Sequence, residues 1–212
     1  MKSFYLFEVV TVVVVVFLVG WTAYGFFFEG EIESPSYKVL QKEGGIELRE
    51  YDPFIIAETV VDAPYDSAIN AGFRRLANFI FGNNQSNSKI AMTAPVIHHQ
   101  EMSQSSPLGF VDVTDTGTHR VSFVMPLSME MGQIPRPNRD GIELRTVEWG
   151  KVVVIRYSGY SSFDTVKEKS EQLKAYIKES NLEAVSPAMV AQYNSPWVMP
   201  LLRRNEVLVR VK

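Results

Sequence analysis

A four-residue sequence occurs twice in the chain and constrains its fold more than any other feature. Ile46–Arg49 (IELR) recurs at Ile142–Arg145. A β-rich run follows each copy, and each run leads into a stretch with apolar residues at the spacing of a helix. A further extended segment follows each helical stretch. The sequence therefore predicts two copies of a β-β-α-β unit, over about residues 37–99 and 121–212.

Each predicted helix has one apolar face. The apolar positions are Tyr65, Ile69, Phe73, Leu76 and Ile80 in the first helix, and Phe163, Val166, Leu173 and Ile177 in the second. Two such units can share one antiparallel sheet and bury both helices against it. We therefore predict an α+β domain with a pseudo-twofold repeat, whose sheet is curled or closed into a distorted barrel.

The first thirty residues have the character of a membrane anchor. Val9 to Phe28 is an almost continuous apolar run, and about twenty such residues span a bilayer as a helix. Lys2 precedes the run and glutamates follow it, so the positive-inside rule places the N-terminus in the cytoplasm. We expect a transmembrane anchor over 1–30, a linker over 31–36, and a domain over 37–212 on the extracytoplasmic (periplasmic) side.

A cleaved signal peptide is the alternative for this region. Ala23 and Gly25 are small residues of the kind found at a cleavage site. The apolar character continues through Phe28, which favours a retained anchor. In either case the domain is expected outside the cytoplasm.

Charge, cysteine content and motifs exclude several classes of protein. The formal net charge of −3 argues against a general nucleic-acid-binding protein, which normally carries a basic patch. The absence of cysteine excludes disulfides, thiolate ligands to metal or haem, and covalent haem attachment through cysteine. The motifs of serine hydrolases, zinc proteases and phosphate-binding loops are also missing. We therefore expect a binding protein and not an enzyme.

A stretch near the C-terminus combines a stiff turn with basic residues. Pro196 and Pro200 bracket Trp197, and prolines restrict both their own backbone and that of the preceding residue. Arg203 and Arg204 follow, and guanidinium groups pair bidentately with the carboxylates of a flat ligand. The alternative is that Trp197 belongs to the core and that the arginines pair with nearby acids.

Three segments together resemble the SOUL haem-binding family. They are KIAMTAPV at 89–96, VSFVMPLS at 121–128 and YNSPWVMPLLRRNEV at 193–207. The resemblance covers about residues 35–212, with the three segments in the order the family has them. It implies the curled α+β architecture and non-covalent binding of haem or a related tetrapyrrole.

Haem iron usually takes an axial ligand from the protein, and the adjacent His98 and His99 are the candidate metal ligands. If residues 90–99 form a strand, Met92 and His98 share one face and His99 lies on the other. The alternative is that both histidines are simply solvated at the end of a strand.

The resemblance leaves the mode of binding open. In some relatives a histidine in the part matching residues 46–61 is thought to be the axial ligand, but here Tyr51 is the nearest donor. Other relatives are thought to bind porphyrin through an apolar helix face and basic side chains. In this chain the corresponding cofactor-binding candidates are Phe73, Arg74, Arg75 and the nearby Lys89. The alternative for Arg74 and Arg75 is ordinary solvent exposure.

Two functions follow from these observations. The first is a membrane-anchored haem-binding or tetrapyrrole-binding protein that carries or buffers haem outside the cytoplasm. The second is a structural or accessory subunit of a membrane protein complex, in which the domain binds partner proteins. The fold is also similar to bacterial drug-sensing domains, so a different flat apolar ligand is a third reading.

Overall fold

The computed structural model describes residues 8, 10–13, 20, 32–101, 116–138 and 140–212. Within these ranges, none of the helices has the length and apolar character needed to cross a membrane. The predicted anchor over 1–30 lies almost entirely outside the described residues, so it stays a prediction.

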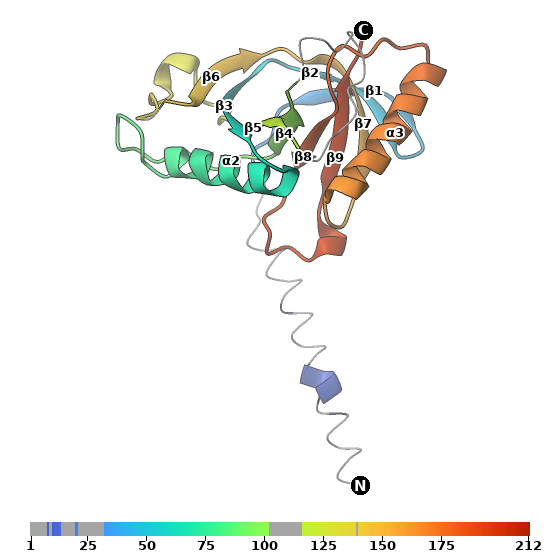
Figure 1. Cartoon of the computed structure of the whole chain (residues 1–212), viewed down its shortest axis with the longest axis horizontal. Helices are drawn as coiled ribbons and strands as arrows, with labels where there is room; N and C mark the ends of the chain where they lie inside the picture. The colour runs from blue at the N-terminus through green and yellow to red at the C-terminus, as the bar shows by residue number, and fades with distance from the viewer. Residues whose placement is uncertain (1–7, 9, 14–19, 21–31, 102–115, 139) are drawn as a thin grey trace.

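One antiparallel sheet organises the described part of the chain (Figure 1). Its nine strands lie in the order β1-β2-β7-β9-β8-β4-β5-β3-β6. The strands are β1 Tyr37–Glu43, β2 Ile46–Tyr51, β3 Phe54–Asp62, β4 Val96–Gln100, β5 Thr118–Val124, β6 Ile142–Val147, β7 Gly150–Tyr157, β8 Met189–Gln192 and β9 Asn205–Arg210. The helices are α2 Tyr65–Ile80 and α3 Phe163–Glu179, with short 3-10 helices η1 Met131–Gln133 and η2 Pro200–Leu202.

The two faces of the sheet are covered differently. Both helices pack on one face, α2 over β3 and β5 and α3 over β7 and β9 (Figure 1). The opposite face is concave and closes on its own apolar cluster, in which Trp149 makes edge contacts with the rings of Tyr51 and Phe54. Because side chains alternate along a strand, β2 to β9 contribute apolar residues to both faces, whereas every residue of β1 is exposed.

Both copies of the repeated sequence form strands, and each pairs with the other half of the chain. β2 pairs with β7, with Leu48 opposite Val153. β6 pairs with β3, with Leu144 opposite Ala57. β9, the final strand, lies in the interior of the sheet between β7 and β8. The predicted α+β fold with a curled antiparallel sheet is confirmed.

The predicted strand over 90–99 is wrong in its first half. β4 begins at Val96, and residues 90–95 are irregular. Pro95 has no N–H to donate and restricts the backbone of Ala94, so a strand ladder cannot continue through these positions. Met92 therefore does not belong to the strand face that was predicted to carry it beside His98, and its side chain is exposed.

Gly72 lies where α2 packs tightly against Val121 of β5. A Cβ atom at this position would lie 2.6 Å from Val121 Cβ and 2.5 Å from Val121 Cγ2. Alanine normally favours a helix by about 1 kcal/mol over glycine, but forced overlap in a packed core costs about 1–3 kcal/mol. We expect Gly72→Ala to lower the free energy of unfolding in urea denaturation, by about 1 kcal/mol. Gly132→Ala, where a Cβ would meet no atom within 4 Å, is the control. A more stable Gly72→Ala protein would contradict the close approach.

Candidate functional site

His98 and His99, the predicted metal ligands, lie on opposite faces of β4. His98 is buried beneath α2, where its Nε2 lies 3.2 Å from the hydroxyl oxygen of Tyr65. His99 lines a cavity on the concave face. The sheet backbone therefore separates the two imidazoles, and the structure does not bring them to one iron. The alternative of two solvated histidines is wrong for His98, which is 1% exposed.

Burial of these histidines makes stability depend on pH. Burial lowers the pKa of His98 to about 3 and that of His99 to about 4, because a charged imidazole would lose its hydration. In the unfolded chain both titrate near 6.5, so below this pH the unfolded state binds more protons than the folded state. We expect the free energy of unfolding to fall, between about pH 6 and pH 5, by about 1 kcal/mol for each histidine.

Urea denaturation across this pH window measures the effect, and His98→Leu is the informative variant. It removes the contribution of one buried histidine and should make the dependence of the free energy of unfolding on pH less steep. Glu47 and Glu58 do not interfere, because their pKa values lie below the ordinary 4.5. If the free energy of unfolding depends on pH as steeply in His98→Leu as in the unchanged protein, His98 does not contribute to this dependence.

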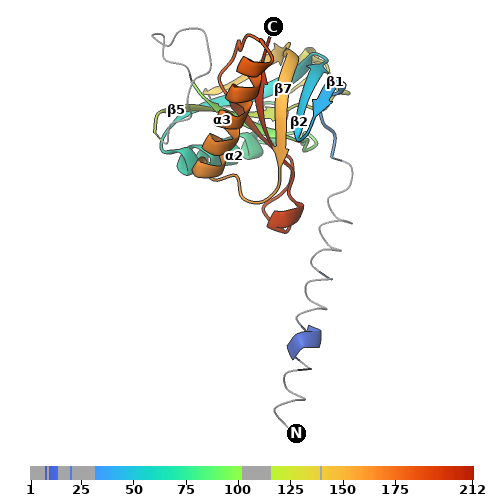
Figure 2. The ribbon, with the colours of Figure 1, turned by 90° about the vertical axis from the view of Figure 1, so that its right-hand side faces the viewer.

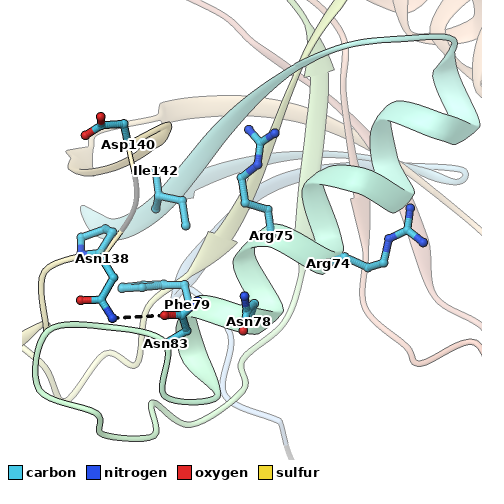
Figure 3. Close-up of a pocket in the computed structure, with 9 residues that line it drawn as sticks. Arg74, Arg75, Asn78, Phe79, Asn83, Asn138, Asp140 and Ile142 are labelled. Atoms are coloured by element: carbon cyan, nitrogen blue, oxygen red, sulfur yellow. Dashed lines mark hydrogen bonds between the residues drawn. The ribbon is translucent and has the colours of Figure 1, made fainter.

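Arg74 and Arg75, predicted as cofactor-binding residues, line a cavity of about 480 Å³ between α2 and the loop before β6 (Figure 3). Arg75 points across the cavity, but its Nη1 already donates to Thr59 Oγ1 at 2.7 Å. Arg74 points away from it (Figure 3). The opposite wall carries amides and Asp140, so the cavity lacks the broad apolar wall that a macrocycle needs.

The other residues predicted for the α2 face do not join this cavity. Phe73 packs against Phe123 in the core under α2, with ring centroids 5.3 Å apart. Lys89 and Met92 are exposed in the irregular segment before β4. The described residues therefore assemble only the two arginines of that predicted site.

Glu206 is the centre of a buried ion-pair network on the concave face. Its carboxylate is fully buried and accepts two hydrogen bonds from Arg49, at 2.9 and 3.1 Å. Arg204 donates to the same carboxylate at 2.8 and 3.0 Å, and the Tyr193 hydroxyl donates at 2.9 Å. Burial alone would lower the pKa of Arg49, but Glu206 raises it above its ordinary value. Arg204 is thus paired with an acid, as the alternative interpretation stated.

Arg203 holds the Pro-bracketed turn in place. Its guanidinium donates to the carbonyl oxygens of Val198 and Pro196, at 2.8 and 2.6 Å, and lies 5.2 Å from the ring centroid of Tyr160. Trp197, within the turn, is 75% exposed, so the alternative that it belongs to the core is wrong. The turn therefore presents aromatic surface to solvent.

A groove of about 600 Å³ opens beside this turn, and we call it the η2 groove. It lies where the end of β7 and the β1–β2 turn meet η2, at the lower end of the sheet in Figure 2. Leu201 and Leu202 line it and are 77% and 58% exposed. Tyr37 and Tyr157 also contribute to its wall. Two adjacent exposed leucines form an apolar surface that a ligand or partner can cover.

The lining of the η2 groove also carries charged side chains. Lys42, Arg156 and Arg203 line it, together with one acid, Glu47. Lys42 pairs with Glu47 at 2.9 Å, whereas the guanidinium of Arg156 makes no hydrogen bond or ion pair with any described residue. An apolar surface beside available cations is suited to a flat amphiphilic anion.

Comparison with known proteins identifies the family. A family model described as SOUL heme-binding protein matches residues 32–210. The chain belongs to the SOUL family. It is 30% identical over 182 residues to Heme-binding protein 2 of Mus musculus and to that of Homo sapiens, covering 83% of this chain and 84% of each relative.

Solved structures similar to this SOUL domain show the same fold in distant proteins. The EcmrR C-terminal domain matches with a TM-score of 0.54 at 11% identity, over 83% of this chain and 98% of that domain. EcmrR in its DNA complex matches with a TM-score of 0.58 at 10% identity, over 79% of this chain and 57% of that chain. At these identities the similarity concerns the fold alone.

Haem is the cofactor that membership of the SOUL family indicates, and the η2 groove fits it. Leu201 and Leu202 offer apolar surface for the ring, and the surrounding cations offer partners for two propionates. The described lining contains no histidine or methionine. Burial raises the pKa of Tyr157 to about 12, and its hydroxyl lies 2.7 Å from Ser161 Oγ, so it stays protonated at neutral pH. The lining therefore fits non-covalent binding with weak or no axial ligation.

Sequence reasoning missed the four residues of the η2 groove that offer apolar surface or charge to a ligand: Leu201, Leu202, Lys42 and Arg156. The leucine pair lies inside the segment that carried the SOUL resemblance, and two apolar residues between a proline and two arginines were a usable signal. Lys42 and Arg156 had no such signal, because long-range strand pairing brings them there.

Proposed function

We propose that this SOUL protein binds haem non-covalently in the η2 groove and acts as a haem carrier or buffer. The exposed Leu201–Leu202 pair carries the proposal, together with Arg156 in the same groove, whose guanidinium has no partner among the described residues. Covering a leucine side chain contributes about 1.5–3 kcal/mol, so the pair alone accounts for a substantial part of a useful affinity.

The residues of the η2 groove would hold and orient the haem. Leu201 and Leu202 would contact its ring, and Arg156 and Lys42 would receive its propionates. Bound haem would supply the iron and the absorbing ring. Without a strong axial bond to break, binding and release are governed by apolar contact and charge, which suits reversible transfer.

A haem titration of the full chain, followed by Soret absorbance against a protein-free blank, tests this proposal. We expect a saturable shift at one haem per chain. The shift should survive in a His98→Leu/His99→Leu variant, because neither histidine lines the η2 groove. If this variant folds normally but no longer shows the Soret shift, haem binds at the histidines of β4 and not in the η2 groove. An affinity no higher than that of an unrelated protein of similar hydrophobicity would refute haem binding altogether.

We also propose that residues 1–30 anchor the domain on the extracytoplasmic side of a membrane. The apolar run from Val9 to Phe28, with Lys2 before it, supports this topology. The folded domain begins close behind the run, since the Glu33 carbonyl accepts a hydrogen bond from Ala94 N–H at 2.9 Å. Alkaline carbonate washing should leave the full-length chain in the membrane fraction. Release of the intact chain would contradict an anchor, and a shortened chain would indicate a cleaved signal peptide.

An accessory role in a membrane protein complex is the second candidate function. It is favoured by the exposure of Trp197 and Tyr160, 75% and 67%, next to the η2 groove, because aromatic residues are enriched at protein interfaces. Gentle extraction separates the two functions. A partner that co-purifies in fixed ratio and is lost in Trp197→Ser would support the accessory role, whereas an unaccompanied protein carrying haem supports the first.

We infer that the two halves of the domain are related by a pseudo-twofold axis. Exchanging β2 with β6, β3 with β7, β4 with β8 and β5 with β9 reverses the order of the eight strands from β2 to β6. The repeated unit would then be β-β-α-β-β, one strand longer than the sequence predicts. An experimental structure whose halves do not superpose would overturn this inference.

A further inference from the structure

A third cavity, of about 290 Å³, opens on the concave face of the sheet and shares no lining residue with the η2 groove. Ile56, Ile97, Trp149 and Met189 form its apolar wall, and all four are buried. Its volume is about half that of the groove and lies at the lower edge of the range of roughly 300–1,000 Å³ for small-molecule sites. It therefore suits a ligand of one or two rings, and not a macrocycle.

Glu58 also lines this cavity, and its carboxylate already accepts four hydrogen bonds from protein side chains. Glu58 Oε1 accepts from Arg120 Nη1 at 2.8 Å and from Arg145 Nε at 3.3 Å. Its Oε2 accepts from Ser122 Oγ and from Arg145 Nη2, both at 3.0 Å. A carboxylate has about four lone-pair positions, so Glu58 has none left for a cationic ligand.

Hydrogen-bond donors remain in the same cavity. Arg145 Nη1 has no partner among the described residues, and the Arg145 side chain is 40% exposed. Arg210 uses Nε to bind the Trp149 carbonyl at 3.2 Å, which leaves both of its terminal nitrogens without a partner in the described part of the chain. His99 Nδ1, which donates in one of the two neutral tautomers, is buried and has no hydrogen-bond partner among the described residues. Glu148, the other acid of the lining, is exposed, so water screens its charge.

We propose that this concave cavity binds a small organic anion with an aromatic or branched apolar body. Arg145 and Arg210 bind the anionic group, and Trp149 and its apolar neighbours cover the body. Saturated Glu58 serves to hold Arg145 in place, since two of the three guanidinium nitrogens bond to it. This site is independent of the η2 groove and of haem.

Two fluorescent probes that share their rings test the proposal: 8-anilinonaphthalene-1-sulfonate, an anion, and N-phenyl-1-naphthylamine, which is uncharged. Both are titrated into the full chain. We expect the anion to bind saturably and at least about tenfold more tightly than the neutral probe, because a charge-assisted bidentate pair contributes about that factor. Equal affinities would overturn the proposal.

Arginine variants locate the binding. Arg145→Leu and Arg210→Leu should each raise the dissociation constant of the anionic probe about tenfold or more. Arg74→Leu, which changes an exposed arginine outside the cavity, should leave it unchanged. Arg210→Leu leaves every contact of Glu58 intact, so it remains informative if Arg145→Leu destabilises the fold. If neither cavity variant changes the affinity for the anionic probe, the probe does not bind in the concave cavity. If probe binding is lost only in Leu201→Glu/Leu202→Glu, the probe binds in the η2 groove, and this result would also overturn the proposal.

Discussion

Replacing Glu206 by leucine is expected to lower the free energy of unfolding by about 3–5 kcal/mol. The substitution removes the acceptor of four hydrogen bonds from Arg49 and Arg204, and Arg49 is 2% exposed. The Arg49 guanidinium keeps its ion pair with Glu47 at 2.8 Å but loses its fully buried partner, so it keeps the cost of lost hydration and loses much of the compensating attraction. Single domains are stable by only about 5–15 kcal/mol, so this one change removes a large share of the total.

Urea denaturation measures the loss, and Glu183→Leu is the matched control. Glu183 is 69% exposed and lies 4.0 Å from Lys212, so its removal should change the free energy of unfolding by less than about 1 kcal/mol. Similar values for the two variants would mean that the Glu206 network is solvated and contributes little.

A second substitution with a large expected effect changes the leucine pair of the η2 groove and acts on haem binding. We expect Leu201→Glu/Leu202→Glu to raise the dissociation constant for haem by at least about 100-fold, because two apolar contacts are lost and two negative charges face the propionates. Stability should change by less than about 0.5 kcal/mol, since both leucines are exposed. Haem titration and urea denaturation of the same preparation separate a local effect from unfolding.

Two control variants define where haem binds. Leu127→Glu changes an exposed leucine that does not line the η2 groove, and it should leave the haem affinity unchanged. Arg74→Glu tests the site that the sequence predicts on the face of α2. Haem binding lost in Arg74→Glu and retained in the double leucine variant would place the site beside α2 and contradict the η2 groove.

Local features of the fold could be predicted from the sequence because neighbouring residues determine them. α2 and α3 begin where the apolar residues at helical spacing begin. Ser162 is the N-cap of α3, and its hydroxyl oxygen accepts a hydrogen bond from Thr165 N–H, as is typical of serine at this position. β9 covers the alternating apolar run near the C-terminus. The strand predicted from residue 90 was wrong because the pattern was followed through Pro95, which cannot donate to a ladder.

The candidate site was harder to predict because its residues are distant in sequence. Arg204 was predicted to receive a ligand, but its partner Glu206 is two residues away, and the pattern alone could not decide between an acid and a propionate. The η2 groove depends on Ile46 lying opposite Ile155, a pairing across more than one hundred residues. His98 and His99 were correctly assigned to opposite faces, but only the packing of α2 shows that one of them is inaccessible.

The position of β9 has a consequence for biosynthesis. The last strand of this domain to leave the ribosome fills the middle of the sheet, between β7 and β8. Until it emerges, β7 pairs only with β2 and β8 only with β4, so each has one edge of unpaired backbone groups, and such edges invite association with other chains. The sheet can therefore be completed only after Asn205–Arg210 has left the ribosome. A chain that is exported as it is made would reach the far side of the membrane still unfolded, and a chain that stops short of Asn205 would become a substrate for proteases.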